Sequence, residues 1–435
     1  MLSGSERLEG RDARAVLVGA GEGRYMGELG RLAATLGMEV TGVVEQARRD
    51  NAGYLGSGKR EEVRELVSDV GASFVVTDDE LTASQARRLE RDTGSNVVDR
   101  TELIIRIFEV HAGDAASRLE VELADLQYRL PRIKGRNPEL SRLGGGRGGS
   151  GGGAGGGARR GSGEQQLEYD RRAIRERIES INRRLRREKV GREVRGARLN
   201  EGPTPTVALV GYTNAGKTTI LNALSGAGRS TKDRLFETLG TTTRLVEGPS
   251  AGNGAHGARP DFAVTDTVGF IRKLPTQLVH SFASTLEAAR NSDVQILCAD
   301  ASSQDLEEEI STVRRTLAEG DDKASQPSLL CLNKMDLVPE DRARELAKRY
   351  PEAVRISAKT DVGPLLGKIY AAIDADRERM EVMIPHADYA AASRLYGLAD
   401  IHARENTEEG LWMDVSLPRS ASPRYAPYKV SSKRP

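Results

Sequence analysis

The sequence has only two cysteines, Cys298 and Cys331, and each lies within an apolar run. Two cysteines placed in this way form neither a zinc motif nor a disulfide framework, and they suit a reducing compartment. No apolar run approaches the roughly 18 residues that a membrane span needs. The first seven residues lack the apolar core of a signal peptide. These absences predict a cytoplasmic protein without a membrane anchor.

The chain also lacks an excess of charge of either sign, because 65 Lys and Arg residues are balanced by 64 Asp and Glu residues. Any basic surface for a polyanion must therefore be local. The five histidines, at positions 111, 256, 280, 386 and 402, follow no metal-ligand spacing. A length of 435 residues exceeds that of one typical domain, so several domains are expected.

The most informative stretch is GYTNAGKTT, which matches the phosphate-binding pattern G-x-x-x-x-G-K-[ST]. An apolar run at 206–210 precedes it, as a strand should, and residues 219–224 place apolar side chains on one helical face. A glycine loop between a strand and a helix N-terminus directs several backbone N–H groups at one anionic point. We expect Lys217 to neutralise the outer phosphates and Thr218 to ligate Mg²⁺. The predicted phosphate-site residues are Gly211, Tyr212, Thr213, Asn214, Ala215, Gly216, Lys217, Thr218 and Thr219.

A second phosphate signature, DTVG, follows a predicted strand at 261–265. We expect Asp266 to hold Mg²⁺ through water and the Gly269 N–H to meet the terminal phosphate of a nucleotide. Between the two signatures, residues 233–244 form a predicted switch, in which Thr242 or Thr243 would complete the Mg²⁺ shell. The sequence does not choose between the two threonines. The predicted metal ligands are Thr218, Thr242, Thr243 and Asp266, and the predicted catalytic residues are Lys217, Thr242, Thr243 and Gly269.

Guanine recognition is predicted from two further motifs, NKMD at 333–336 and SAK at 357–359, which follow predicted strands at 328–332 and 354–356. A carboxylate at Asp336 can accept hydrogen bonds from both N1–H and the exocyclic amine of guanine, a pairing that adenine does not offer. Asn333 would tie the loops together, and the stem of Lys334 would lie over the base. The backbone of the second motif, Ser357, Ala358 and Lys359, would contact the guanine oxygen. The four motifs in this order predict a GTPase domain over residues 204–378.

Upstream, residues 1–112 are predicted to form an α/β domain with a parallel sheet, because short apolar strands alternate with amphipathic helices. The strands are expected at 15–18, 40–44, 73–76 and 96–98, and the helices at 25–36, 59–70 and 84–93. Residues 19–23 partly match a dinucleotide fingerprint, but Arg24 stands where the third glycine would fall. A plain strand-to-helix turn is the usual meaning of such a match, and a second nucleotide site is the alternative.

Residues 113–200 are predicted to form a basic helical hairpin around a flexible glycine-rich loop at 144–163. A helix at 101–130, broken near Gly113, precedes the loop. A second helix, from Glu164 to about Arg195, carries a narrow apolar stripe suited to one antiparallel partner. Residues 159–198 hold fourteen Arg or Lys and seven Asp or Glu residues. This surplus indicates either a solvated helix face or a contact to nucleic-acid phosphates.

Residues 379–435 are predicted to form a small C-terminal α+β domain, with strands at 382–384 and 411–415 around a helix at 388–398. From Pro418 onward the sequence reads as a loose tail. The fold class is therefore an α/β multidomain protein. It joins an N-terminal sheet domain and helical hairpin to a P-loop GTPase domain with a mostly parallel, doubly wound sheet, followed by the small C-terminal domain.

The chain resembles the HflX family of translational GTPases, and the resemblance does not rest on the G motifs alone. The segments NAGYLGSGK at 51–59 and VDRTELIIRIF at 98–108 are similar to family signatures. GSGEQQLEYDRR at 161–172 is close to the family's G-P-G-E-T-Q-L-E-x-D-R-R, with Ser162 and Gln165 as departures. DTVGFI at 266–271 is the family's form of its motif. The switch reads Gly240-Thr241 where Asp-Pro is usual, which loosens the backbone before the switch threonines.

We expect a monomeric GTP hydrolase that uses Mg²⁺, and the resemblance implies that it binds the large ribosomal subunit near the peptidyl transferase centre. It further implies rescue, splitting or recycling of stalled ribosomes under stress. The hairpin would then reach ribosomal RNA, with contacts expected from Arg159, Arg160, Arg171, Arg172 and Arg175. The alternatives are a GTP-gated RNA or protein binding module acting in ribosome assembly, and a P-loop phosphotransferase, for which no substrate lid with its own acid or base is found.

Phe270 occupies the position directly after Gly269, where many regulatory GTPases carry a glutamine that orients the attacking water. A phenyl ring can neither orient nor deprotonate water. Positioning supplies most of the catalysis in phosphoryl transfer, so hydrolysis by the free protein should be slow. The alternative is that Phe270 packs in the core while another polar residue positions the water.

Overall fold

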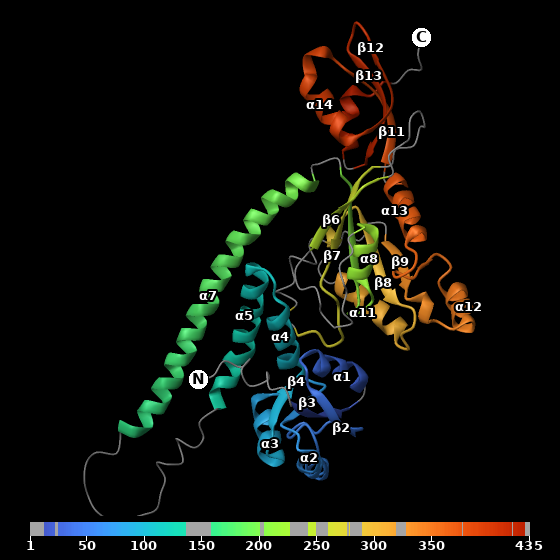
Figure 1. Ribbon diagram of the computed structural model, residues 1–435. Helices are drawn as coiled ribbons and strands as arrows, with labels where there is room; N and C mark the ends of the chain where they lie inside the picture. The colour runs from blue at the N-terminus through green and yellow to red at the C-terminus, as the bar shows by residue number, and fades with distance from the viewer. Residues whose placement is uncertain are drawn as a thin grey trace, which may run out of the picture. The chain divides into compact units, whose positions relative to one another are not determined.

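The structure is a computed structural model, in which the chain divides into two compact units. It describes residues 13–21, 25–135, 158–200, 204–226, 242–248, 260–275, 278, 289–318, 328–375, 377–419 and 421–430 (Figure 1). The first unit holds Met1–Lys189, Asp233–Gly240 and Lys273–Ala283, and the second holds Val190–Lys232, Thr241–Arg272 and Ser284–Pro435. The chain therefore passes from the second unit to the first at the peptide bond between Arg272 and Lys273.

The first unit is built on a parallel four-stranded sheet with the order β2-β1-β3-β4. Helices α2 and α3 pack on one face through Val63, Val67 and Leu89, while α1 and α4 lie together on the other face (Figure 1). This confirms the predicted α/β layer. The strands are β1 (Arg14–Ala20), β2 (Glu39–Gln46), β3 (Phe74–Thr77) and β4 (Asn96–Asp99), and the helices are α1 (Met26–Thr35), α2 (Ser57–Val70), α3 (Ala83–Thr93) and α4 (Arg100–His111).

Capping residues explain where these helices begin and end. Thr82 and Gln85 form a capping box at the start of α3, each side chain accepting a backbone N–H of the other residue. The carboxylate of Asp99 caps the N-terminus of α4 by accepting the backbone N–H of Glu102. Gly71 and Gly94 end α2 and α3 in the left-handed conformation, which a side chain would disfavour.

A helical hairpin follows, formed by α5 (Ala115–Arg129) and the long α7 (Ala158–Asn200), which run antiparallel (Figure 1). The break between α4 and α5 falls where the sequence predicts it, and Asp114 caps α5. The hairpin is held by an apolar cluster of Leu119, Leu123 and Ile181, against which Leu126, Ile178 and Leu185 pack. The pairing of the two helices is therefore the predicted one.

The predicted extent of the glycine-rich loop, 144–163, is wrong at its C-terminal end. Helix α7 begins at Ala158, so residues 158–163 are helical. Ala158, Arg159 and Arg160 are strong helix formers, and extending a formed helix over isolated glycines costs less than starting a new one. The rest of the predicted loop lies outside the described residues. After α5 the chain makes one further element, the 3₁₀ helix η2 (Leu130–Gly135).

The second unit contains a six-stranded sheet with the order β10-β9-β8-β5-β7-β6, in which every neighbouring pair is parallel except β6 with β7. Helices α8 and α13 cover a core that includes Phe262 and Tyr370. The strands are β5 (Thr206–Gly211), β6 (Thr242–Val246), β7 (Phe262–Asp266), β8 (Val294–Asp300), β9 (Ser328–Asn333) and β10 (Val354–Arg355). The helices are α8 (Lys217–Leu224), α11 (Leu306–Ala318), α12 (Glu340–Arg349) and α13 (Gly363–Ala375). Strand β5 lies inside the sheet, so the loop after it leaves from the middle of the carboxyl edge.

The C-terminal part is a three-stranded antiparallel sheet, β11-β13-β12, with its own apolar core. Its elements are β11 (Arg377–Ile384), η4 (His386–Asp388), α14 (Tyr389–Leu398), β12 (Asp400–Asn406), β13 (Leu411–Pro418), α15 (Ser422–Tyr425) and η5 (Ala426–Tyr428). Strand β12 was not predicted, because its sequence DIHAREN is polar and mostly exposed at the sheet edge.

The predicted loose tail from Pro418 is also wrong for the described residues. Tyr425 is buried in the C-terminal core, and the hydroxyl of Tyr428 donates to the carboxylate of Asp388. The backbone N–H of Val430 donates to Glu381 O at 2.9 Å. One buried tyrosine and these hydrogen bonds hold a segment whose local composition suggested no structure.

The core of the second unit gives a first testable prediction. Phe262 is fully buried and meets Tyr370 edge to face, with ring centroids 5.4 Å apart. Phe262→Ala should lower the free energy of unfolding by about 3–5 kcal/mol, because the lost contacts leave a cavity. The matched control is Leu245→Ala, on the neighbouring strand and 52% exposed, which should cost about 0.5 kcal/mol or less. Urea unfolding followed by circular dichroism measures both, and equal losses would show that the Phe262 site is not a close-packed core.

Candidate functional site

The loop between β5 and α8 has a backbone that only glycine allows at two points. A Cβ at Gly211 would lie 2.2 Å from Cys298 O on the adjacent strand β8. Gly216 has a φ of +88°, and a Cβ there would lie 2.2 Å from Nδ2 of Asn333. Both glycines are therefore required by close approaches, in addition to the turn. The result is a tight loop that enters the N-terminus of α8.

Lys217, the first residue of α8, turns its ammonium group back over this loop. Its Nζ donates to Gly211 O at 3.1 Å and to Tyr212 O at 2.9 Å. Burial lowers the pKa of the Lys217 ammonium, and the nearby carboxylate of Asp266 acts in the opposite direction. A buried cation beside the N-terminus of a helix is suited to bind the phosphates of a nucleotide.

Two hard oxygen ligands meet next to this lysine. The hydroxyl of Thr218 donates to Oδ2 of Asp266 at 2.7 Å, and Asp266 is fully buried. Among the described residues there is no group of three or more His, Cys, Asp or Glu side chains that could enclose a metal. Mg²⁺ typically keeps several waters and binds one or two protein ligands together with substrate phosphates. The pair therefore fits Mg²⁺ shared with a nucleotide.

The register of β6 on β7 separates the two switch threonines. Thr242 lies opposite Asp266, and Thr243 lies opposite Thr265. Opposed residues of an antiparallel pair share a face of the sheet, so Thr242 is on the face of the metal-site carboxylate. Thr243 is exposed, and its hydroxyl lies 2.9 Å from that of Thr265. Thr241 and the rest of the predicted switch, 233–241, lie outside the described residues.

The DTVG segment rests directly on the phosphate-binding loop. Phe270 donates its N–H to Gly211 O at 3.0 Å and accepts from Thr213 N at 2.8 Å. A Cβ at Gly269 would lie 2.9 Å from Thr213 Cα and 3.1 Å from Nζ of Lys217. The side chain of Phe270 is apolar and buried, so this residue places no polar group beside Gly269.

The base-recognition loops are joined by Asn333. Its Nδ2 donates to Ala215 O at 2.9 Å, and its Oδ1 accepts from Ala358 N at 2.9 Å. Lys334 has a φ of +62°, and its ammonium pairs with Asp300 at 2.8 Å. The site therefore has one amide that fixes both the phosphate loop and the SAK loop.

Asp336 itself is exposed at the edge of the site. The hydroxyl of Ser357 lowers the pKa of the Asp336 carboxyl, and Lys359 and Lys334 add to that effect. The group is consequently ionised at neutral pH and available to accept hydrogen bonds from a ligand.

The structure brings the four nucleotide motifs together at the carboxyl edge of the six-stranded sheet. It also shows contacts that the sequence did not predict. Tyr212, at a variable position of the motif, accepts the N–H of Arg272 through its hydroxyl at 2.7 Å. The guanidinium of Arg272 pairs with Asp305 at 3.2 Å and with Glu308 at 3.1 Å. No motif marks these residues, because their partners lie on separate elements.

The predicted RNA-contact arginines belong to α7, in the first unit. Arg171 and Arg175 pair with Glu168 at 3.8 and 3.4 Å, and Arg172 pairs with Glu176 at 2.9 Å. The side chains of Arg159 and Arg160 lie outside the part of the chain that the structure describes. The structure therefore shows helix-face ion pairs for three of the five predicted residues.

Comparison with known proteins identifies the family. Three family models match in sequence along the chain: a GTP-binding GTPase N-terminal region at residues 23–109, a GTP-binding GTPase middle region at 111–198, and a 50S ribosome-binding GTPase at 206–334. The GTPase HflX of Caldanaerobacter subterraneus subsp. tengcongensis is 40% identical over 356 residues, which cover 81% of this chain and 76% of that protein. The chain belongs to the HflX family of GTPases.

A second relative agrees with this assignment. The GTPase HflX of Akkermansia muciniphila is 39% identical over 412 residues, covering 92% of this chain and 91% of the relative. A GTP-binding protein from Sulfolobus solfataricus in complex with GDP is 22% identical, with a TM-score of 0.42, and covers 83% of this chain and 97% of that one. The GTPase family model and the HflX relatives show that the chain is a GTP hydrolase. No helix in its described part is both long and apolar enough to cross a membrane.

The base site gives a second prediction. Asp336→Asn should weaken GTP binding and strengthen binding of xanthosine triphosphate, because the amide cannot accept two hydrogen bonds from guanine. The loss of one such partner corresponds to about 1–3 kcal/mol. Glu340→Gln, another exposed acid nearby, is the control and should leave both affinities unchanged. Fluorescence titrations with labelled nucleotides provide the measurement, and unchanged GTP affinity in Asp336→Asn would remove this residue from the base site.

Proposed function

We propose that this HflX-family GTPase binds the large ribosomal subunit, which activates its GTP hydrolysis, and that it rescues, splits or recycles stalled ribosomes under stress. The observation that carries the proposal is a GTPase site in the same chain as a long helix with exposed, unpaired arginines. The matched family description of a 50S ribosome-binding GTPase supports the same partner. The cytoplasm is the corresponding location.

The residues of the site have separate roles in this proposal. Lys217 neutralises the outer phosphates, and Thr218 and Asp266 hold Mg²⁺, which neutralises charge on the phosphates when it is bound. Thr242 is the proposed switch ligand, since it shares a face of the sheet with Asp266 while Thr243 does not. Gly269 offers its N–H to the terminal phosphate. Asn333, Lys334, Asp336 and the SAK backbone select guanine.

The state of Phe270 supports activation by a partner. Its backbone is hydrogen-bonded to the phosphate-binding loop at Gly211 and Thr213, and its ring is buried. Hydrolysis needs a positioned water, and a residue held in this way does not provide one. A ribosomal contact that moves the Phe270 segment would therefore raise the rate.

Four exposed arginines of α7 are the best candidates for RNA contacts, among residues 167–188, whose side chains the structure describes. Within 167–188, these four form no ion pair, while Arg171, Arg172, Arg175 and Arg177 each pair with a glutamate. The four are Arg183, Arg184, Arg186 and Arg187. An unpaired, solvated guanidinium binds a phosphate without first giving up a carboxylate partner.

The proposed partner gives a third prediction. Purified large subunits should raise single-turnover GTP hydrolysis at least tenfold, which corresponds to roughly 1.4 kcal/mol off the barrier. Small subunits are the control and should have little effect. Fast hydrolysis by the free protein that subunits do not change would contradict the proposal. Stimulation by assembly precursors, but not by mature subunits, would instead favour the role in ribosome assembly.

A fourth prediction concerns the helix. The variant Arg183→Ala/Arg184→Ala/Arg187→Ala should flatten the slope of log K against log salt for subunit binding by about one unit per lost phosphate contact. The matched variant Arg171→Ala/Arg172→Ala/Arg175→Ala should flatten it less, because these arginines already have glutamate partners. Co-sedimentation across a salt series measures both slopes. A wild-type slope in both variants would show that this face of α7 is merely solvated.

A further inference from the structure

The carboxyl edge of the four-stranded sheet in the first unit has the topology of a ligand site. Strand β2 lies on one side of β1 and β3 on the other, so the connections after β1 and β3 leave toward opposite faces. In open α/β sheets, ligands bind in the crevice at such a switch point. Here the connection after β3 begins with two acids, Asp78 and Asp79, at the edge opposite the start of α1.

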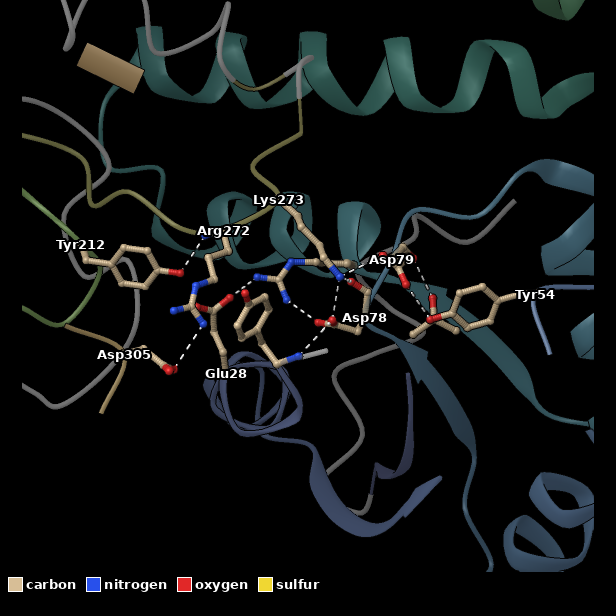
Figure 2. Close-up of polar contacts among 11 residues, drawn as sticks. Glu28, Tyr54, Asp78, Asp79, Tyr212, Arg272, Lys273 and Asp305 are labelled. Carbon is tan, nitrogen blue, oxygen red and sulfur yellow. Dashed lines mark hydrogen bonds and ion pairs between the residues drawn. The ribbon is translucent and has the colours of Figure 1, made fainter. Parts of the chain in front are cut away.

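The group bound at this edge is the ammonium of Lys273 (Figure 2). Its Nζ lies 2.8 Å from Oδ2 of Asp78, 2.9 Å from Oδ1 of Asp79 and 3.3 Å from the carbonyl oxygen of Asp78. An ammonium group has three N–H donors and no acceptor, and these three oxygens match the three donors.

The two carboxylates are held in place by other residues of the first unit. Asp78 turns its Oδ1 to the guanidinium of Arg100 at 2.7 Å, and Asp79 turns its Oδ2 to the hydroxyl of Tyr54 at 3.0 Å. Each carboxylate therefore has one oxygen fixed by the sheet domain and the other directed at Lys273. Asp78 is fully buried and Arg100 is almost fully buried, so these charged groups lie inside the first unit and not on its surface.

The same contacts exclude a nucleotide from this edge. The N–H of Tyr25, at the start of α1, donates to Oδ2 of Asp78 at 3.2 Å. In a dinucleotide site the amide groups at this position would face a phosphate. Here an aspartate already occupies one of them, and a second aspartate adds negative charge. The described residues of this edge therefore favour a cation over a phosphate, while residues 22–24 of the partial glycine fingerprint lie outside the described residues.

Lys273 adopts an unusual backbone conformation at this position. Its φ is +51°, and within the described chain only three other non-glycine residues, Tyr54, Asn214 and Lys334, have a positive φ. Such a conformation costs energy and persists where the surroundings hold it. The preceding residue, Arg272, is held separately by Tyr212, Asp305 and Glu308 in the second unit. Consecutive residues of the DTVGFIRK segment are thus fixed by different partners (Figure 2).

We propose that the acidic crevice formed by Asp78 and Asp79 is a binding site for a lysine ammonium group, and that Lys273 occupies it only when no terminal phosphate is bound. Lys273 is four residues beyond Gly269, which rests against Thr213 of the phosphate loop. A terminal phosphate that contacts both elements has to separate them. Four residues span at most about 13–14 Å, so Lys273 stays close to Gly269, and the displacement reaches Lys273 when Arg272 moves with the segment.

The proposal implies that the Lys273 contact is coupled to the affinity of the protein for GTP relative to GDP. A contact made in only one of two states biases the equilibrium by its differential free energy, and the effect is reciprocal. An ion pair that persists with GDP and is lost with GTP therefore lowers GTP affinity relative to GDP. The inference rests on the GTPase activity of the family and does not require a ribosome.

The test uses the full-length protein and measures its affinities for fluorescent GDP and for a non-hydrolysable GTP analogue. Lys273→Met keeps the apolar stem and removes the charge, and Asp79→Asn keeps the acceptor for Tyr54 and removes the charge. Each should raise the affinity for the GTP analogue relative to GDP by about fivefold or more, the lower end of measured site–site couplings. The matched control is Lys59→Met, which removes an exposed lysine paired with Glu62 and should leave the ratio unchanged.

A double variant makes the test specific to the contact. Lys273→Met combined with Asp79→Asn should change the ratio no more than Lys273→Met alone, because Lys273→Met already removes the contact to Asp79. Asp78 is left intact, because it is buried with Arg100 and its replacement would cause a folding defect.

Three outcomes would overturn the proposal: a wild-type ratio in Lys273→Met, additive effects in the double variant, or an equal effect of Lys59→Met. A wild-type protein that binds no GTP analogue would instead contradict the GTPase assignment.

Discussion

Two backbone hydrogen bonds between Phe270 and the phosphate-binding loop hold the DTVGF segment against that loop. They continue the pairing of β5 and β7 beyond the strands, and they bring Gly269 against Thr213. The proposed activation by a ribosomal subunit and the proposed lysine site both depend on this short pairing. A ribosomal contact in the first case, and a terminal phosphate in the second, would act by releasing backbone that the phosphate-binding loop holds.

The sequence predicted those parts of the fold and the site whose cause is local. The phosphate-binding loop needs two glycines, a lysine and a hydroxyl in a fixed order, so nine residues of sequence are enough to recognise the motif. The strands and helices that were predicted for the two sheets show their apolar periodicity in the same way, whereas β6, α11, α12 and α13 were not predicted. The polar strand β12 and the segment around Tyr425 were not predicted, because their order comes from a neighbouring strand and a shared core. Helix α7 begins earlier than predicted. The helix formed by later residues extends back over 158–163, whose own sequence does not start a helix.

Contacts between distant residues could not be predicted from one sequence. Lys273 and Asp78 are 195 positions apart, and neither belongs to a pattern that marks a partner. The buried group of Arg100 with Asp78 and Glu28 is similar, since nothing local indicates that an arginine and two acids meet inside the sheet domain. Buried ion pairs carry a desolvation cost and are weak evidence for stability alone. Here they also orient Asp78, whose Oδ1 accepts from Arg100 while its Oδ2 accepts from Lys273.

The most direct test of this account is amide hydrogen exchange at Phe270 and Thr213 in the full-length protein. With GDP bound, both amides should be protected, because Phe270 donates to Gly211 and Thr213 donates to Phe270. With a non-hydrolysable GTP analogue, protection at Phe270 should fall as the segment separates from the loop. Equal protection of Phe270 with both nucleotides would contradict the claim that a terminal phosphate releases the segment.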